Sequence, residues 1–199
     1  PDNWPTLLPT IRNSLNLQTP ERLYGALFAL RLLVKNFEFR RDDRRKPLEV
    51  IVAETFPLLG QLLQATLQQP TVQGAELAHL AAKIFWSATQ LSLPPLIIDP
   101  AQRASWMELL LVLMQQPLPE GAPTDDEVAA TWFPWKLKKR VAAILHRFLA
   151  RYGNPSRHKE GAVSAEVGAF AVFFQVRRPV VVVVVVVTST ASATALRPR

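Results

Sequence analysis

Apolar residues recur at helical spacing through most of this chain. Between residues 23 and 34, for example, Leu23, Leu27, Leu30 and Val34 follow the three- and four-residue steps of one buried helix face. No strand-like alternation competes with this pattern before residue 180. The pattern predicts six helices, namely residues 4–15, 20–34, 48–67, 74–88, 100–115 and a helix that follows the acidic cap 125–127 and contains residues 132–152.

Many of the 17 prolines stand where these helices begin, bend or end. Thr19 is a favourable N-cap, and Pro20 fits the first helical position. Pro57 lies inside the third helix and is expected to bend it, because proline removes one backbone hydrogen bond. Gly153 and Pro155 are expected to end the sixth helix. The prolines therefore indicate helical hairpins and not disorder.

The six helices form three pairs that begin near residues 4, 48 and 101. Those starts are separated by 44 and 53 residues, close to the repeat length of HEAT and armadillo proteins. One pair cannot bury its apolar face alone, so neighbouring pairs must stack. We therefore expect an all-α superhelix of about three helical pairs over residues 1–157.

Residues 158–199 have a different character. A run of eight valines occupies positions 180–187, and no charge occurs from 179 to 196. A membrane anchor is disfavoured, because nearly half of that uncharged stretch is Ser, Thr and Ala. We expect a divergent, low-complexity, disordered tail, with one further helix over 164–176. The start at Pro1, without Met or a leader, suggests a fragment.

The net charge of +7 is a poor guide to partners. Residues 1–157 carry 18 basic and 14 acidic side chains, whereas the last 42 residues carry 5 and 2. Two basic clusters, 136–140 and 40–46, could meet phosphates, but a solvated helix face and a loop salt network explain them equally well or better. Direct nucleic-acid binding is therefore not expected.

Residues for catalysis or cofactor binding are scattered. The chain has no Cys, and its histidines, at 79, 146 and 158, lack metal-binding spacing. The seven glycines form no phosphate-binding loop. The acidic run 125–127 is explained by helix capping. We expect no enzyme activity, catalytic residue, metal, cofactor or small-molecule substrate. The five tryptophans, at 4, 86, 106, 132 and 135, are expected mostly in the repeat core.

Several longer strings are distinctive. They are YGALFALRLLVKNFEFR at 24–40, ETFPLL at 54–59, KIFWSATQ at 83–90, WMEL at 106–109, PLPEG at 117–121 and RYGNPS at 151–156. Together, over about residues 4–157, they resemble the importin-β (karyopherin-β) superfamily, in its importin-seven/importin-eight branch. After Ser156 the chain leaves this pattern, and the valine run has no counterpart in it.

The resemblance implies a HEAT-repeat nuclear import receptor that shuttles between cytoplasm and nucleus. Its implied partners are protein cargo, phenylalanine-glycine nucleoporins and the GTPase Ran. It also implies that the main Ran-binding repeats precede Pro1 and that most cargo-binding repeats lie beyond residue 157. Two alternatives remain open, a HEAT-repeat scaffold outside nuclear transport and a truncated, non-functional product. The residues that contact these partners cannot be named from the sequence.

Overall fold

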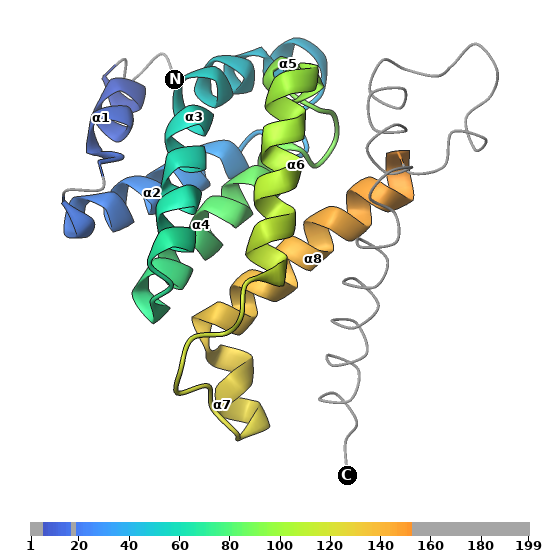
Figure 1. Cartoon of the computed structure of the whole chain (residues 1–199). Helices are drawn as coiled ribbons and strands as arrows, with labels where there is room; N and C mark the ends of the chain where they lie inside the picture. The colour runs from blue at the N-terminus through green and yellow to red at the C-terminus, as the bar shows by residue number, and fades with distance from the viewer. Residues whose placement is uncertain (1–5, 17–18, 153–199) are drawn as a thin grey trace. The chain divides into compact units, whose positions relative to one another are not determined.

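The computed structural model describes residues 6–16 and 19–152 (Figure 1). No β-strand occurs in these ranges, which confirms the expected all-α class of a HEAT-repeat segment. The described part divides between Ile97 and Ile98 into two compact units. Its helices are α1 (Leu7–Ser14), α2 (Pro20–Lys35), the 3-10 helix η1 (Asp42–Arg45), α3 (Lys46–Gln68), α4 (Val72–Ala88), α5 (Pro95–Ile98), α6 (Pro100–Gln115), α7 (Asp126–Thr131) and α8 (Phe133–Tyr152).

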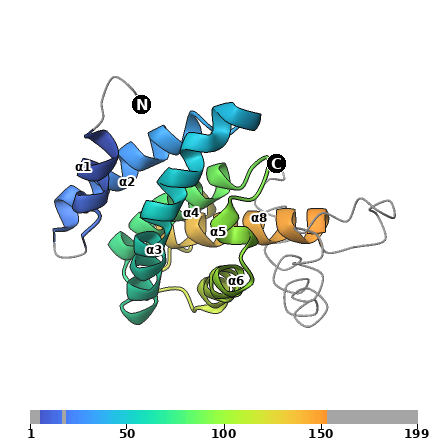
Figure 2. The same ribbon diagram turned by 90° about the horizontal axis from the view of Figure 1, so that it is seen from above.

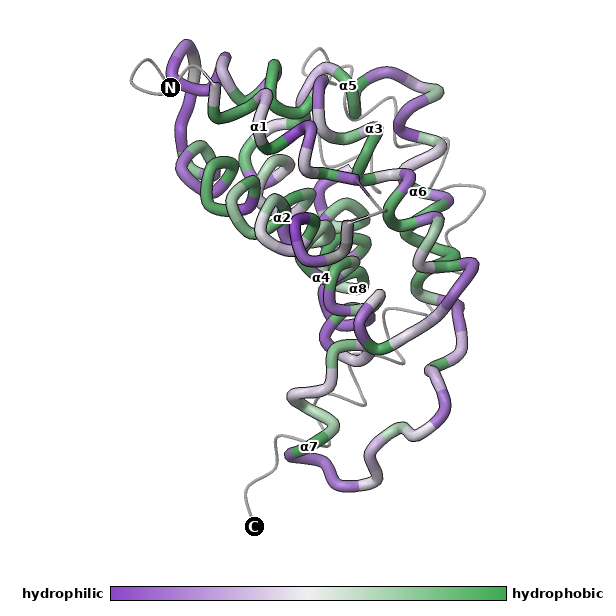
Figure 3. Tube along the Cα trace, turned by 90° about the vertical axis from the view of Figure 1, so that its left-hand side faces the viewer, coloured by the Kyte–Doolittle hydropathy of each residue, from purple (hydrophilic) through white to green (hydrophobic). Residues whose placement is uncertain are grey.

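The first unit consists of two stacked helical hairpins. α1 packs on α2 and α3 packs on α4, and the hairpins meet through α2 against α4 and α1 against α3 (Figures 1 and 2). In the core, the rings of Phe56 and Phe85 stack with centroids 5.8 Å apart. Along α2 the hydropathy changes from residue to residue, as expected of a helix with a buried and an exposed side (Figure 3). This is the predicted stacking of neighbouring pairs.

Helix starts follow the capping chemistry of the sequence. Thr19 occupies the N-cap position of α2 with Pro20 in the first turn, as predicted, although the Thr19 side chain makes no capping hydrogen bond. α4 begins at Val72, two residues before Gly74, because the Thr71 hydroxyl accepts a hydrogen bond from the Gly74 amide and caps the helix there. α1 begins at Leu7, and the predicted cap at Asn3 lies outside the described residues.

α3 continues through Pro57, as predicted. The segment Asp43–Gln68 is long and apolar enough to cross a membrane by length and composition, but 44% of its most apolar window is buried in the fold. Its buried residues include Leu48, Val52 and Leu59, and the helix packs against α4. The apolar character of α3 is therefore explained by its place in the core.

The second unit pairs α6 with α8, and α7 also contacts α8. α6 has the predicted bounds, Pro100 to Gln115. The single helix predicted from the acidic cap to Tyr152 is wrong, because α7 ends at Thr131 and Trp132 is extended (φ −69°, ψ 130°). A continuous helix would force the Pro134 ring against the carbonyl four residues earlier. The expected stop at Gly153, the helix at 164–176 and the valine run lie outside the described residues.

Candidate protein-binding cleft

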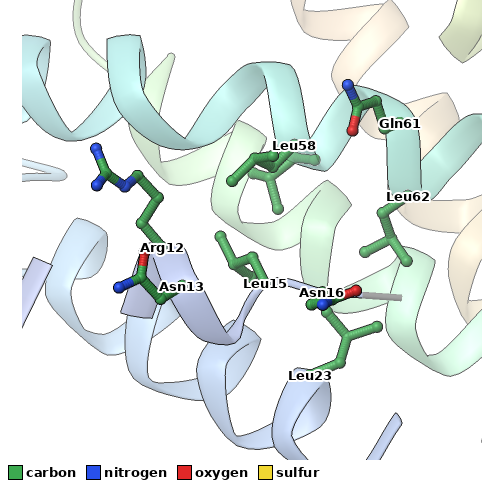
Figure 4. Close-up of a pocket in the computed structure, with 9 residues that line it drawn as sticks. Arg12, Asn13, Leu15, Asn16, Leu23, Leu58, Gln61 and Leu62 are labelled. Atoms are coloured by element: carbon green, nitrogen blue, oxygen red, sulfur yellow. The ribbon is translucent and has the colours of Figure 1, made fainter. Parts of the chain in front are cut away.

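A surface cleft of about 370 Å³ opens between α1 and α3 in the first unit. Its walls come from the end of α1, the residues just after it, the start of α2 and the middle of α3. In Figure 4 the side chains of Leu15, Leu58 and Leu62 converge in the space between these helices. The lining residues are Arg12, Asn13, Leu15, Asn16, Leu23, Leu58, Leu59, Gln61 and Leu62.

The cleft has an apolar floor and a polar rim. Leu15, Leu23, Leu59 and Leu62 are buried, and Leu58 is half-buried at the wall. The four polar lining residues are exposed: Arg12, Asn13, Asn16 and Gln61. A leucine floor favours an apolar side chain, and the side-chain amides of Asn13 and Gln61 can hydrogen-bond the peptide groups that flank it.

One ion pair joins the two helices at the edge of the cleft. A guanidinium nitrogen of Arg12 on α1 lies 3.4 Å from a carboxylate oxygen of Glu54 on α3. The two side chains are 48% and 34% exposed, so solvent screens the attraction and the pair contributes less than about 1 kcal/mol. The cleft width is therefore set mainly by leucine packing.

The cleft is suited to binding and offers little for catalysis. Among the described residues that line it, Arg12 is the one that can ionise. A pocket without a nucleophile or a general base lacks the usual features of an active site. Its volume lies near the lower end of the about 300–1,000 Å³ range of ligand pockets, which suits one or two side chains of a partner.

Comparison with known proteins identifies the family. The chain is 38% identical over 179 residues to an importin β-like SAD2 homolog of Arabidopsis thaliana, covering 88% of this chain. It is 28% identical over 177 residues to importin-8 of Homo sapiens and 29% over 150 residues to a probable importin-7 homolog of Dictyostelium discoideum, covering 87% and 73% of this chain. The chain belongs to the importin-β superfamily, in its importin-7/importin-8 branch.

This importin chain spans only 17%, 16% and 14% of the length of those three relatives. The similarity to the Arabidopsis relative covers 88% of this chain, which is more than residues 4–157 alone. The matched part therefore extends beyond residue 157. No family model matches the sequence. No solved structure matches it.

The residues singled out for chemistry are dispersed in the importin fold. His79 is buried on α4, His146 is exposed on α8, and His158 lies outside the described residues. No group of three or more metal-binding side chains occurs in residues 6–16 and 19–152. The Asp125 carboxylate accepts hydrogen bonds from the amides of Glu127 (3.0 Å) and Val128 (2.9 Å), which confirms the capping interpretation.

The tryptophans confirm the core interpretation only in part. Trp106 is buried on α6, whereas Trp86, Trp132 and Trp135 are half-buried, and Trp4 lies outside the described residues.

The basic cluster 136–140 is not simply a solvated helix face. The Lys138 ammonium donates hydrogen bonds to the carbonyl oxygens of Met114 (2.7 Å) and Gln116 (2.5 Å) at the end of α6. Burial lowers the pKa of Lys138 below the ordinary lysine value. The Lys136 ammonium lies over the Phe133 ring, 4.9 Å from its centroid. Lys138 therefore caps the carbonyl end of its partner helix.

The charged link 40–46 is likewise more ordered than a loop salt network. The predicted ion pairing occurs between Lys46 and Asp43, 2.7 Å apart. Arg45, however, is buried, and its guanidinium donates to the carbonyl oxygens of Phe37 (2.9 Å), Ala88 (2.5 Å) and Ser92 (3.1 Å). Burial lowers the pKa of Arg45, and the nearby Glu49 carboxylate partly offsets that effect.

Sequence reasoning missed the polar rim of the cleft. The leucines of its floor follow the predicted helical pattern, but Arg12, Asn13, Asn16 and Gln61 have no spacing that distinguishes them from ordinary surface residues. The sequence pattern that could have indicated the cleft is the expected stacking of neighbouring helical pairs. That stacking places the end of the first helix beside the middle of the third.

Proposed function

We propose that this chain is a segment of a nuclear transport receptor that carries protein cargo through the nuclear pore under the control of Ran. The similarity to importins over most of the chain carries this proposal. The receptor acts by binding and flexing, without a catalytic step, and moves between cytoplasm and nucleus. In this proposal residues 1–157 form its helical repeats, and the divergent tail within 158–199 begins only after the part that is similar to the relatives.

The α1–α3 cleft is the contact with phenylalanine-glycine nucleoporins in this proposal. A phenylalanine side chain fits a leucine-lined floor, and the glycine beside it lets the peptide backbone approach the rim. Asn13 and Gln61 can then hydrogen-bond the exposed peptide groups. A single small contact of this kind is weak, which suits rapid passage through many repeated contacts.

An exposed apolar stripe on α2 supports a place inside a longer solenoid. Tyr24, Phe28 and Leu32 follow one another at four-residue steps and are 44%, 44% and 49% exposed. Leu23, Leu27, Leu30 and Val34, on the other side of the same helix, are buried. Since the matched part of the chain makes up only 17% and 16% of two relatives, we propose that a further helical hairpin covers this stripe.

Flexing follows from the way the hairpins contact one another. In the first unit the two hairpins meet through α2 against α4 and α1 against α3. Small rotations at successive contacts add up along a solenoid. Ran in its GTP form and cargo can then be coupled through different preferences for curvature.

A pull-down with phenylalanine-glycine repeat peptides tests the pore contact. Leu58→Asp places a charge at the wall of the cleft and should abolish binding. Val50→Asp is the matched control, because Val50 is exposed on the same helix and does not line the cleft. Circular dichroism should show both variants folded.

Retention of peptide by the chain and by Val50→Asp, with loss in Leu58→Asp, supports the proposal. Equal binding by all three proteins assigns the contact to another surface. Absence of binding at about millimolar peptide, where even a weak contact is occupied, overturns the pore-contact part and leaves a scaffold role outside transport as the better account.

A further inference from the structure

The turn that joins α2 to α3 is clamped at both of its ends. Near its start, the Glu38 carboxylate accepts a hydrogen bond from the Ser87 hydroxyl of α4 (3.2 Å). At its end, the Arg45 guanidinium donates to carbonyl oxygens at residues 37, 88 and 92. Hydrogen bonds to the rest of the first unit therefore hold residues 39–44 at both ends of the segment.

The clamped turn exposes one aromatic ring among arginines. Phe39 is 72% exposed, more than any other large hydrophobic residue in the described part of the chain. Arg40, Arg41 and Arg44 are exposed beside it in sequence. An aromatic ring and arginines are the side chains that most often anchor protein interfaces, and here they stand on a turn that is held in place.

The charge of this turn is only partly balanced. Residues 39–46 carry five basic and two acidic side chains. Arg45 points its charge into the fold, and Lys46 pairs with Asp43. No ion pair joins Arg40, Arg41 or Arg44 to another side chain in the part of the chain whose side chains are described. By charge count alone, the three other arginines of the segment exceed its one other aspartate.

We propose that this α2–α3 turn docks an acidic segment of a partner protein that carries an aromatic or aliphatic side chain among its carboxylates. The apolar side chain packs on the Phe39 ring. Carboxylates on either side pair with Arg40, Arg41 and Arg44, whose planar guanidinium groups match carboxylate geometry. The clamp lowers the ordering cost, because the turn already has its bound conformation.

A protein segment fits this surface better than nucleic acid. Single-stranded nucleic acid is held by several aromatic rings in succession along a basic groove. This turn presents one exposed ring and not a succession of rings on which bases could stack. None of the docking residues lines the α1–α3 cleft, so the inference stands independently of the nucleoporin contact.

The test is a fluorescence-anisotropy titration of the whole chain with a labelled peptide in which one Phe is flanked on each side by two Asp or Glu residues. A peptide with Asn and Gln in their place measures the charge requirement. Phe39→Ala removes the ring, and Arg41→Glu/Arg44→Glu reverses the charge. The matched control is Arg22→Glu/Lys139→Glu, two exposed basic residues elsewhere with the same change in net charge.

We expect the acidic peptide to bind, with affinity that falls as salt rises. The reversal at 41 and 44 should weaken binding at least about tenfold, whereas the matched control should change it less than about twofold. Phe39→Ala should weaken it several-fold. Equal losses in the two charge reversals, or binding unaffected by Phe39→Ala, overturn the proposal. Tighter binding of a labelled 20-nucleotide single strand at the same residues would also overturn it, in favour of nucleic acid.

Discussion

Arg45 donates a hydrogen bond of 2.5 Å to the carbonyl oxygen of Ala88, a residue 43 positions later in the chain. The same guanidinium reaches Phe37 and Ser92, so one side chain joins the end of α2, the η1 turn and the end of α4. Carbonyls at helix ends lack partners within the helix and carry partial negative charge. Arg45 supplies both the donors and the opposite charge.

Arg45→Ala should lower the free energy of unfolding by about 2–4 kcal/mol, since it leaves buried carbonyls without donors. Arg45→Lys should recover only part of that loss, because an ammonium cannot copy the planar fork. Chemical denaturation followed by tryptophan fluorescence measures both. Arg44→Ala, at the exposed neighbour, should stay within about 0.5 kcal/mol of the parent. Equal effects at 44 and 45 would contradict the clamp.

Asp125→Ala should fray α7 without unfolding the chain. Its carboxylate accepts the amides of Glu127 and Val128, and loss of such a cap costs about 1 kcal/mol. α7 has no buried residue in its six positions, so the effect should remain local. Hydrogen exchange should accelerate in Asp126–Thr131 and stay unchanged in α6. Asp125→Asn should keep most of the protection. Faster exchange throughout the second unit would show that α7 is instead part of the core.

Phe28→Lys should reduce self-association of the isolated chain while changing its stability by less than about 0.5 kcal/mol. The reason is that Phe28 belongs to the exposed stripe of α2. Leu27→Lys, one residue earlier and fully buried, should unfold the first unit. Sedimentation velocity and thermal melts separate the two effects. In a longer protein that contains the neighbouring hairpin, Phe28→Lys should become destabilising.

Lys138 should make stability depend on pH. Burial lowers its pKa in the folded chain, so at a pH between the folded and unfolded values the unfolded state binds more protons. Stability therefore rises with pH in that window, just below the ordinary lysine pKa. The free energy of unfolding of the parent, relative to Lys138→Met, should increase as pH is raised from neutral towards that value. Lys139→Met, at an exposed lysine, is the control for loss of one positive charge. If the free energy of unfolding of Lys138→Met changed with pH in parallel with that of the parent, the burial of the Lys138 ammonium would be contradicted.

The sequence predicts helices well where local chemistry agrees with packing. α6 keeps its predicted bounds because Asp99 caps it and Pro100 opens it. The sixth helix was predicted as one continuous element, which is wrong, because the helix is interrupted at Trp132 and restarts at Phe133 with Pro134 in its first turn, where proline is tolerated. Pro57 has the same chemistry, yet α3 continues through it because buried residues on both sides of Pro57 hold the helix in the core.

The candidate sites depend on contacts between distant segments, which periodicity does not report. Gln61 and Asn13 look like ordinary surface residues until α1 and α3 are placed side by side. Arg45 and Lys138 lie in basic runs that suggest solvent exposure. Their roles become visible only when the carbonyl ends of α4 and α6 are located.

The central claim, that an importin segment binds phenylalanine-glycine repeats in the α1–α3 cleft, is tested most directly by methyl NMR. The leucine methyls of the chain are labelled and titrated with a phenylalanine-glycine peptide. Shifts that saturate at Leu15, Leu58 and Leu62, with Leu110 of α6 unchanged, are the predicted result. Shifts confined to leucines outside the cleft, or no shifts at about millimolar peptide, would contradict the claim.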